Sequence, residues 1–329
     1  NENFVFCGVL DGNGHSITDL YIQNEQNNQG LFGMIKNKGL ITNLNITGYV
    51  KGYSYCGLIG GVNEGRIDNC LSYGSVEAAN KYAGGIIGTG GNIHNCINYA
   101  EIYGRSEMVG GITGSSSSTI SNCGNLGRVN SEGAYVGGIV GYQNSGRLYN
   151  CQNNGAINAE AYVGGISGYS RQGSRIYNSC NTGEVTGRQI YIGGICGLFK
   201  REATFDDYSR AVTEKSMINC VNTGVINSKG TNTGSIVGLN DATITHCYWL
   251  YDSESKQGME TGIGNNYYEE SGNYPLNDKQ LKNEENYHTA LYKSKDGYTS
   301  YYKVLDALNA WAFDNKDGVV YEFIGWKLG

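Results

Sequence analysis

Proline is nearly absent from this sequence, with one residue among 329, although Gly occurs 51 times. Gly does not recur at every third position, so collagen is excluded. Charged residues are also scarce, at 16% of the chain, and the net charge is −6 with no run of Lys or Arg. Nucleic-acid binding therefore has no electrostatic support. No apolar stretch approaches the ~20 residues of a membrane span, so membrane insertion is not expected.

The chain also has no signal-peptide pattern, so we expect it to start at a processed N-terminus or to lack residues that precede it. Its polarity comes from Asn, Ser, Thr, Tyr and Gln, and this favours an extracellular or cell-surface location. Apolar residues recur in register, which argues against disorder. A Gly-rich fold with many tight bends and internal repeats remains.

The clearest repeat is a Gly-apolar-x-Gly tetrad, in which Ser replaces the first Gly once. Its closing glycines are 27, 28, 26, 27, 27, 29 and 41 residues apart. The eight copies are Gly30–Gly33, Gly57–Gly60, Gly85–Gly88, Gly111–Gly114, Gly138–Gly141, Gly165–Gly168, Gly194–Gly197 and Ser235–Gly238.

Two further landmarks, apolar-x-Asn-(Leu/Cys) and Gly-x-(Val/Ile), follow in each repeat, as in Ile120–Cys123 and Gly127–Val129. The apolar segments are too short for helices, and turn residues separate them every 8–10 positions, as in short strands. One coil cannot bury its own apolar face, so coils must stack. The sequence predicts an all-β, three-faced parallel β-helix of about nine coils of ~27 residues, right-handed because parallel crossovers favour that hand.

Asn lies between two apolar residues in the second landmark, and these cannot both point inward from one straight strand. Asn tolerates the left-handed bend that this requires, and its amide can bond the equivalent Asn one coil away. We therefore expect an internal ladder of Asn43, Asn69, Asn95, Asn122, Asn150, Asn178 and Asn219. Unrelated, solvent-facing turn asparagines are the alternative.

Six of the ten cysteines share one repeat position, which Leu or Ser occupies in other coils. A position that accepts Leu or Cys is a small apolar core site, so we expect free buried thiols, while disulfides between neighbouring coils stay possible. The six are Cys70, Cys96, Cys123, Cys151, Cys220 and Cys247. The four His are scattered and no CxxC pair exists, so no metal is expected.

The repeat divides the chain into a solenoid over residues 1–251 and a Tyr-rich segment over 252–329. A 16-residue insertion, 200–215, lengthens one coil and either carries recognition or has no role. An open solenoid end must be covered, so we expect 252–329 to be a small mixed α/β cap, with helical character over 276–292 and 300–313.

No catalytic constellation stands out, so an enzyme and a cofactor are not expected. Stacking places Glu101 and Glu184 in one outward row, three coils and about 14 Å apart. This separation exceeds the ~5–9.5 Å between the two carboxylates of a glycosidase. The sequence also lacks an HExxH, GxSxG or P-loop motif.

Aromatic and Arg rows give better grounds for a binding function. Tyr82, Tyr135, Tyr162 and Tyr191 share one repeat position, interrupted by Met108, and Arg147 and Tyr149 stack one coil from Arg175 and Tyr177. Such rows can stack on sugar rings or anchor a protein partner. The alternative is that Tyr is present only as a good β former. The candidate ligand-binding residues are Arg147, Tyr149, Arg175, Tyr177, Tyr135, Tyr162 and Tyr191.

The tetrads, the Asn-Cys runs and the segments Leu10–Ile17, Cys247–Leu250 and Leu305–Trp311 resemble GLUG-repeat proteins, over almost the whole chain. The resemblance implies a large surface or secreted protein of a bacterium, often a gut anaerobe, and adds no catalytic residue. Similar repeats occur in adhesin-like proteins and in N-terminal regions of immunoglobulin A proteases, whose chemistry resides in a separate zinc domain.

The sequence thus predicts a non-catalytic surface or secreted binding module for a host glycan or host protein. A stalk or substrate-recognition region of a larger secreted protease is the alternative, and a polysaccharide-active enzyme is the weakest option. The oligomeric state cannot be derived from the sequence.

Overall fold

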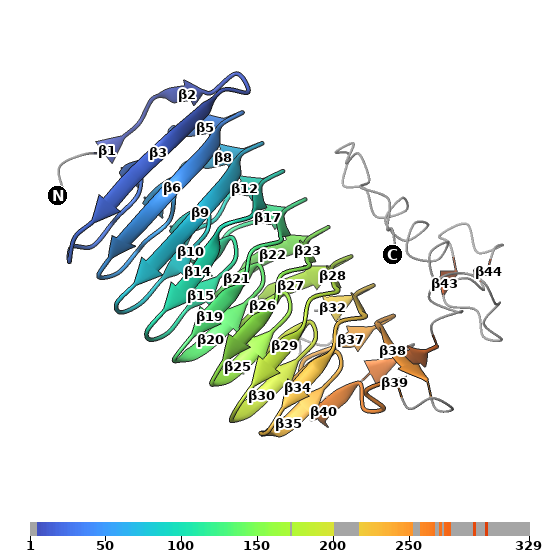
Figure 1. Ribbon diagram of the computed structural model, residues 1–329. Coiled ribbons are helices and arrows are strands. Elements are labelled where there is room, and N and C mark those ends of the chain that lie inside the picture. The colour runs from blue at the N-terminus through green and yellow to red at the C-terminus, as the bar shows by residue number, and fades with distance from the viewer. Residues whose placement is uncertain are drawn as a thin grey trace, which may run out of the picture.

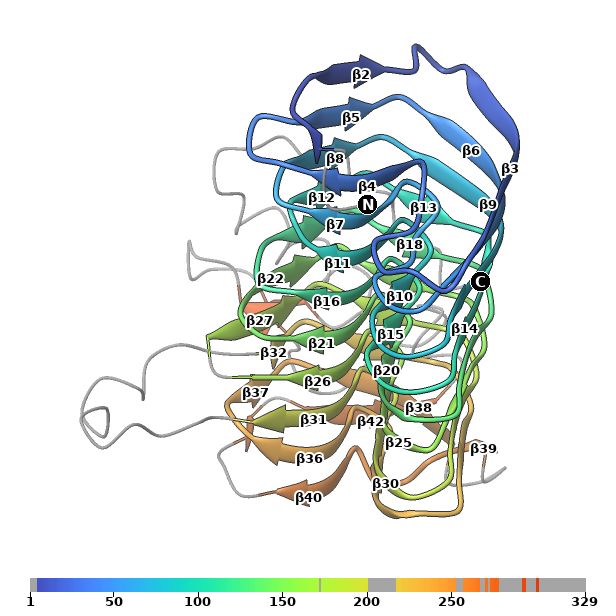
Figure 2. The same cartoon turned by 90° about the vertical axis from the view of Figure 1, so that its left-hand side faces the viewer.

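Short strands stack in register along one axis to form a parallel β-solenoid (Figures 1 and 2). The computed structural model describes residues 5–171, 173–200, 217–252, 257–266, 270–271, 273–277, 292–293 and 300–301. These residues contain strands and turns but no helix. Four sheets, named A to D here, run along the solenoid, and two of them have ten strands. The predicted parallel β-solenoid of about nine turns is confirmed.

Sheets A and B are each ten-stranded and parallel. Sheet A contains β1 (Val5–Phe6), β4 (Phe32–Ile35), β7 (Gly60–Asn63), β11 (Ile87–Gly90), β16 (Thr113–Ser116), β21 (Val140–Gln143), β26 (Ser167–Ser170), β31 (Cys196–Lys200), β36 (Val237–Asp241) and β40 (Ile263–Asn266). Sheet B contains β2 (Val9–Asp11), β5 (Leu40–Thr42), β8 (Arg66–Asp68), β12 (Ile93–His94), β17 (Ile120–Ser121), β22 (Gly146–Tyr149), β27 (Ser174–Tyr177), β32 (Met217–Ile218), β37 (Ile244–Thr245) and β41 (Glu270–Ser271).

Sheet C begins with three long strands and then divides into two rows of short ones. The long strands are β3 (Ser16–Gln23), β6 (Asn45–Gly52) and β9 (Leu71–Ala78). The first row contains β13 (Ile97–Asn98), β18 (Gly124–Asn125), β23 (Gln152–Asn153), β28 (Cys180–Asn181), β33 (Val221–Asn222), β38 (Tyr248–Asp252), β42 (Tyr274–Leu276) and the antiparallel β39 (Gln257–Gly258). The second row contains β14 (Glu101–Gly104), β19 (Val129–Ser131), β24 (Ile157–Ala159), β29 (Val185–Gly187) and β34 (Ile226–Ser228).

Sheet D lies between the second row of sheet C and the next strand of sheet A. It contains β10 (Ala83–Gly84), β15 (Val109–Gly110), β20 (Ala134–Gly137), β25 (Ala161–Gly164), β30 (Ile190–Gly193) and β35 (Thr231–Gly234). A separate antiparallel pair joins β43 (Tyr292–Lys293) to β44 (Ser300–Tyr301).

Parallel pairing continues beyond Asp252, where the sequence repeat becomes hard to see. Strands β40, β41 and β42 pair with β36, β37 and β38, and so add to sheets A, B and C. The insertion expected at 200–215 lies outside the described residues except for Lys200, which ends β31. The helices expected over 276–292 and 300–313 also lie outside the described residues, apart from ends that belong to β42, β43 and β44.

The interior consists of columns of identical or similar apolar side chains, one per coil. In sheet B, for example, Ile67, Ile93 and Ile120 occupy paired positions and are completely buried. Each buried Ile contributes about 1.5–3 kcal/mol relative to an exposed one. Because the columns repeat down the axis, the hydrophobic core is one continuous rod of side chains.

The predicted Asn ladder is present at the bend between sheets B and C. The seven Asn have φ between 46° and 57°, and amide bonds of 2.7 Å (Asn69 to Asn43) and 3.0 Å (Asn122 to Asn95) join consecutive coils. The ladder was expected to be internal, and this was wrong in part. Asn69 and Asn95 are exposed, because the bend turns the amide out of the barrel, while Asn178 and Asn219 are buried.

A second Asn ladder, which the sequence reasoning missed, is the one that runs inside. Its amides donate to the next Asn at 2.7–2.8 Å and to the backbone oxygen two residues on. The first Gly of the tetrad packs against this ladder; a Cβ on Gly138 would lie 2.3 Å from Asn153 Cγ. The members are Asn98, Asn125, Asn153, Asn181 and Asn222.

Removal of one rung of this buried ladder is predicted to destabilise the solenoid. Asn153→Ala leaves the amide of Asn125 and the carbonyl groups of Gly155 and Asn181 without their partner. Each unsatisfied buried group costs about 1–3 kcal/mol, so we expect a clearly lower denaturation midpoint in urea. The neighbouring Asn154 is exposed and is the matched control. Equal midpoints for Asn153→Ala and Asn154→Ala would show that the ladder contributes nothing.

The cysteine row packs in the core as small apolar side chains, and all ten cysteines are free in the structure. Nine are buried and only Cys7 is exposed. Burial raises the pKa of the Cys96, Cys151 and Cys220 thiols of this row, and it raises the pKa of Cys180 and Cys196, outside the row, to about 12. The hydrogen bond with Cys96 lowers the pKa of Cys70, but its side chain is fully buried. Because a reagent needs an accessible thiolate, we expect these buried thiols to be inert in the folded chain.

Thiol titration tests this arrangement. Ellman's reagent at neutral pH is predicted to modify one thiol, Cys7, in the folded protein and all ten after denaturation. The variant Cys7→Ser should then show no fast-reacting thiol. Fewer than ten reactive thiols in denaturant without reductant would instead show disulfides between coils.

Candidate functional site

Five tyrosines from sheets A and D meet at one corner of the solenoid, and we call them the tyrosine patch. Tyr135, Tyr162 and Tyr191 lie on β20, β25 and β30, with ring centroids 4.7 Å and 5.0 Å apart along the column. Tyr142 on β21 and Tyr169 on β26 contact them from sheet A, at 5.8 Å and 5.7 Å from Tyr135. All five rings are half-buried. Burial raises the pKa of Tyr135 and Tyr162, so their hydroxyls remain donors at neutral pH.

The sequence predicted the first three members of the patch but missed Tyr142 and Tyr169. Each follows the closing Gly of a tetrad, at Gly141 and Gly168, so a repeat-position signal existed. The sequence could not show the angle between sheets A and D, which brings the column of Tyr142 and Tyr169 against the column of Tyr135, Tyr162 and Tyr191.

The column of Tyr135 has an unusual backbone. At this position every described residue from Asn28 to Asn232 has a positive φ, and five of the eight are Tyr. The φ values are 60° for Tyr135, 53° for Tyr162 and 59° for Tyr191. Bulky side chains rarely adopt this conformation, whereas Asn accepts it.

The remaining predicted binding residues lie on sheet B. Arg147 and Tyr149 of β22 pair with Arg175 and Tyr177 of β27, in the register that the repeat predicts. All four side chains are half-buried. Because they lie on a different sheet from the tyrosine patch, the seven candidate residues do not form one site, and their role in binding stays a prediction.

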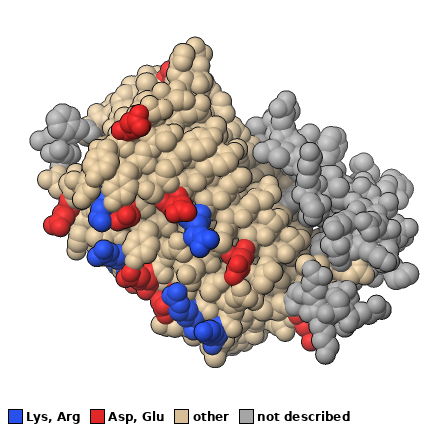
Figure 3. Space-filling view, viewed as in Figure 1, with Lys and Arg blue, Asp and Glu red and all other residues tan. Residues whose placement is uncertain are grey.

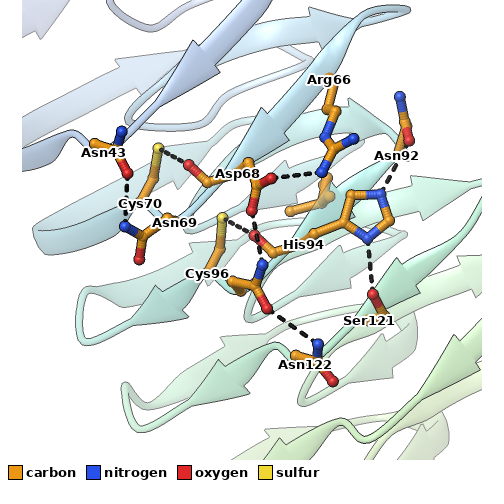
Figure 4. A network of polar contacts seen from close by, with 12 residues as sticks. Asn43, Arg66, Asp68, Asn69, Cys70, Asn92, His94, Cys96, Ser121 and Asn122 are labelled. Carbon is orange, nitrogen blue, oxygen red and sulfur yellow. Dashed lines mark hydrogen bonds and ion pairs between the residues drawn. The ribbon is translucent and has the colours of Figure 1, made fainter. Parts of the chain in front are cut away.

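Nearer the N-terminus on sheet B, a polar network joins the coils of β8, β12 and β17 (Figure 4). His94 Nδ1 lies 2.7 Å from Ser121 Oγ, and His94 Nε2 lies 3.0 Å from Asn92 Oδ1. Asp68 accepts from Arg66 at 2.6 Å and from Asn95 at 2.8 Å, and so replaces Asn69 in the surface ladder.

This network resembles a nucleophile, base and orienting group only in its atom types. Burial, followed by the charge of Arg66, lowers the pKa of His94, and the neutral ring donates from Nε2 to Asn92 and accepts from Ser121. Ser121 is 1% exposed, so no substrate can approach its hydroxyl as a nucleophile would require. The network ties neighbouring coils together.

The structure also bears on the expected carboxylate row, on metal binding and on membrane helices. Glu101 and Glu184 do lie in one outward row of sheet C, three coils apart, as the register of β14, β19, β24 and β29 shows. Within the described ranges, no group of three or more His, Cys, Asp or Glu side chains could hold a metal ion. In the same ranges, no helix is long and apolar enough to cross a membrane.

Comparisons with known proteins give only partial similarities. No protein-family model matches the chain. Halomucin of Haloquadratum walsbyi (strain DSM 16790 / HBSQ001) is 34% identical over 91 residues, which are 27% of this chain and 1% of halomucin. The crystal structure of a candidate immunoglobulin A1 protease from Bacteroides ovatus aligns with a TM-score of 0.44 and 18% identity, over 88% of this chain and 76% of that one. These similarities assign no residue a role, and the resemblance to GLUG-repeat proteins stays a prediction.

The neutral state of His94 predicts a dependence of stability on pH. The folded-state pKa of His94 lies below the unfolded value of about 6.5, so the unfolded chain binds the proton first as the pH falls. The stability that neutral His94 provides is complete above about pH 6.5 and is lost as the pH falls towards the folded-state pKa.

The difference in melting temperature between the native protein and His94→Gln should therefore shrink between about pH 7.5 and about pH 5. His15 is exposed, and His15→Gln serves as the control for unrelated titrations. A difference that stays constant or grows at low pH would contradict the half-buried, neutral imidazole.

Proposed function

We propose that this chain is a non-catalytic binding module, displayed at a cell surface or secreted, that contacts a host glycan or host protein through the tyrosine patch. The resemblance to GLUG-repeat proteins and the low charged fraction of 16% support the location. The patch supports binding, because half-buried tyrosines combine a large rigid ring with a hydroxyl donor at little cost in side-chain entropy.

The observation that carries the proposal is the left-handed backbone beneath the rings. An L-residue in this region loses about 1–2 kcal/mol, and a ring–ring contact returns about 0.5–1.5 kcal/mol. The column of Tyr135, Tyr162 and Tyr191 is therefore close to neutral for stability. Asn28 and Asn232 show that the same bend forms without a ring. The fold does not need tyrosine here, and a partner-binding surface gives a reason for it.

Substitution of Asn for Tyr separates the ring from the bend, since Asn accepts the positive φ. Tyr162→Asn is predicted to melt within a few degrees of the native protein but to bind its ligand about tenfold more weakly, a loss of about 1.4 kcal/mol. Binding is measured first on an array of glycans and mucins and then by titration of the strongest ligand.

Tyr99→Asn is the control for loss of a stacked tyrosine outside the patch, because Tyr99 is exposed, directly follows β13 of sheet C, and stacks only on Tyr73, at 4.7 Å, among the described residues. Equal loss in both variants, or no loss in Tyr162→Asn, contradicts a role for the patch. Silence of the native protein on every glycan and mucin favours a stalk within a larger secreted protein. Release of product from a polysaccharide would contradict the non-catalytic assignment.

A further inference from the structure

A groove of about 720 Å³ lies on the outer face of sheet C, over β19, β24, β29 and β34. This volume is within the range of natural ligand sites, about 300–1,000 Å³. Figure 3 shows charged side chains of both signs gathered across this face of the molecule. The groove is separate from the tyrosine patch, because no member of the patch lines it.

Side-chain length along three outward rows explains the hollow. In the first row, Ala156 lies between the long side chains of Arg128 and Glu184. The middle row holds only short polar side chains, including Asn158, and the turns after the strands contribute Arg188 and Lys229. Short residues thus form a floor between two walls of long ones, across four coils and about 14 Å.

The groove has a net positive charge, whereas the protein as a whole has a net negative charge. Three cations (Arg128, Arg188 and Lys229) and one anion (Glu184) line it, although the chain as a whole carries −6. Another groove on sheet C, of about 630 Å³, has two cations and two anions, and Lys51 and Glu77 form an ion pair there at 2.8 Å.

The existing contacts leave two of the three cations available. Glu184 accepts hydrogen bonds from Thr186 and Asn227, and Arg188 is held by Glu160 at 2.6 Å. Among the residues that the structure describes, neither the Arg128 nor the Lys229 side chain has a hydrogen-bonding or ion-pair partner, and both residues are exposed. The groove therefore presents two unpaired positive charges at opposite walls.

We propose that this groove binds an acidic glycan, with Arg128 and Lys229 contacting its carboxylate or sulfate groups. The proposal rests on the binding function proposed above and names a ligand class for a second surface of the same module. The floor carries one polar side chain per coil, and three of the four are amides: Asn130, Asn158, Thr186 and Asn227. An amide both donates and accepts, which suits sugar hydroxyls.

The test compares the native protein, the double variant Arg128→Gln/Lys229→Gln and Tyr162→Asn against three sugar probes, with poly-L-glutamate as a polyanion that contains no sugar. The sugar probes are an oligogalacturonate (carboxylate), a dextran sulfate oligosaccharide of similar length (sulfate) and neutral maltohexaose. The native protein should bind at least one acidic probe, more weakly as salt is raised, and should not bind maltohexaose. The double variant should lose about tenfold or more of that affinity. Lys36→Gln removes one charge that pairs with Glu64 outside the groove and should change nothing.

The outcomes identify the acidic group that the groove recognises and separate failure of the groove proposal from failure of the tyrosine-patch proposal. Preference for oligogalacturonate over dextran sulfate identifies carboxylate as the recognised group, and the reverse preference identifies sulfate; both support the groove. Equal binding of poly-L-glutamate, no binding of either acidic probe, or no effect of the double variant overturns it. In those cases the proposal for the tyrosine patch would still hold if the native protein binds a glycan or mucin on the array and Tyr162→Asn does not bind it.

Discussion

Left-handed backbone at fixed corners of each coil is the constraint on which this solenoid depends. A parallel coil must turn sharply, and the turn between sheets B and C is made by one residue with φ near 50° at every described level from Asp19 to His246. Asn suits this conformation and bonds its own copy one coil away. The same residue therefore fixes the bend and the register. With the register fixed, side chains at equivalent positions must form columns, and inward columns become the core.

This arrangement separates stability from recognition. Apolar columns, the buried Asn ladder and the glycine beside it account for the fold, and they leave the outward columns free to vary. Two outward-facing regions have features that the fold does not require. One has Tyr at a bend that Asn can also form, and the other has short residues between unpaired cations such as Arg128 and Lys229. Both proposed binding surfaces are of this kind. The His94 network is of the opposite kind, since its groups satisfy one another.

Much of the fold could be predicted from the sequence, because residues at the same repeat position stack on one another in successive coils. The surface Asn ladder and the column of Tyr135, Tyr162 and Tyr191 follow from counting. The buried ladder was missed because Asn98 and its equivalents look like ordinary turn residues, although they recur three positions after the surface Asn. Tyr142 and Tyr169 could not be joined to the patch without the angle between sheets A and D. The groove could not be predicted because it depends on the exact register of residues about 28 positions apart. A register shift of one residue would place core residues where the groove has its outward-facing side chains.

The need for a left-handed residue at the corner between sheets B and C is tested by the thermal stability of the native protein (Asn122) and of the variants Asn122→Gly and Asn122→Ala. Asn122 has φ 53° and is bonded to both neighbours in the ladder at 3.0 Å. Gly loses the bonds but keeps the bend, whereas Ala loses the bonds and adds about 1–2 kcal/mol of backbone strain, more than the entropy it saves. We expect melting temperatures in the order Asn, Gly, Ala, with the native Asn highest. An Ala variant as stable as the Gly variant would contradict this expectation, because the corner would then not require a left-handed residue.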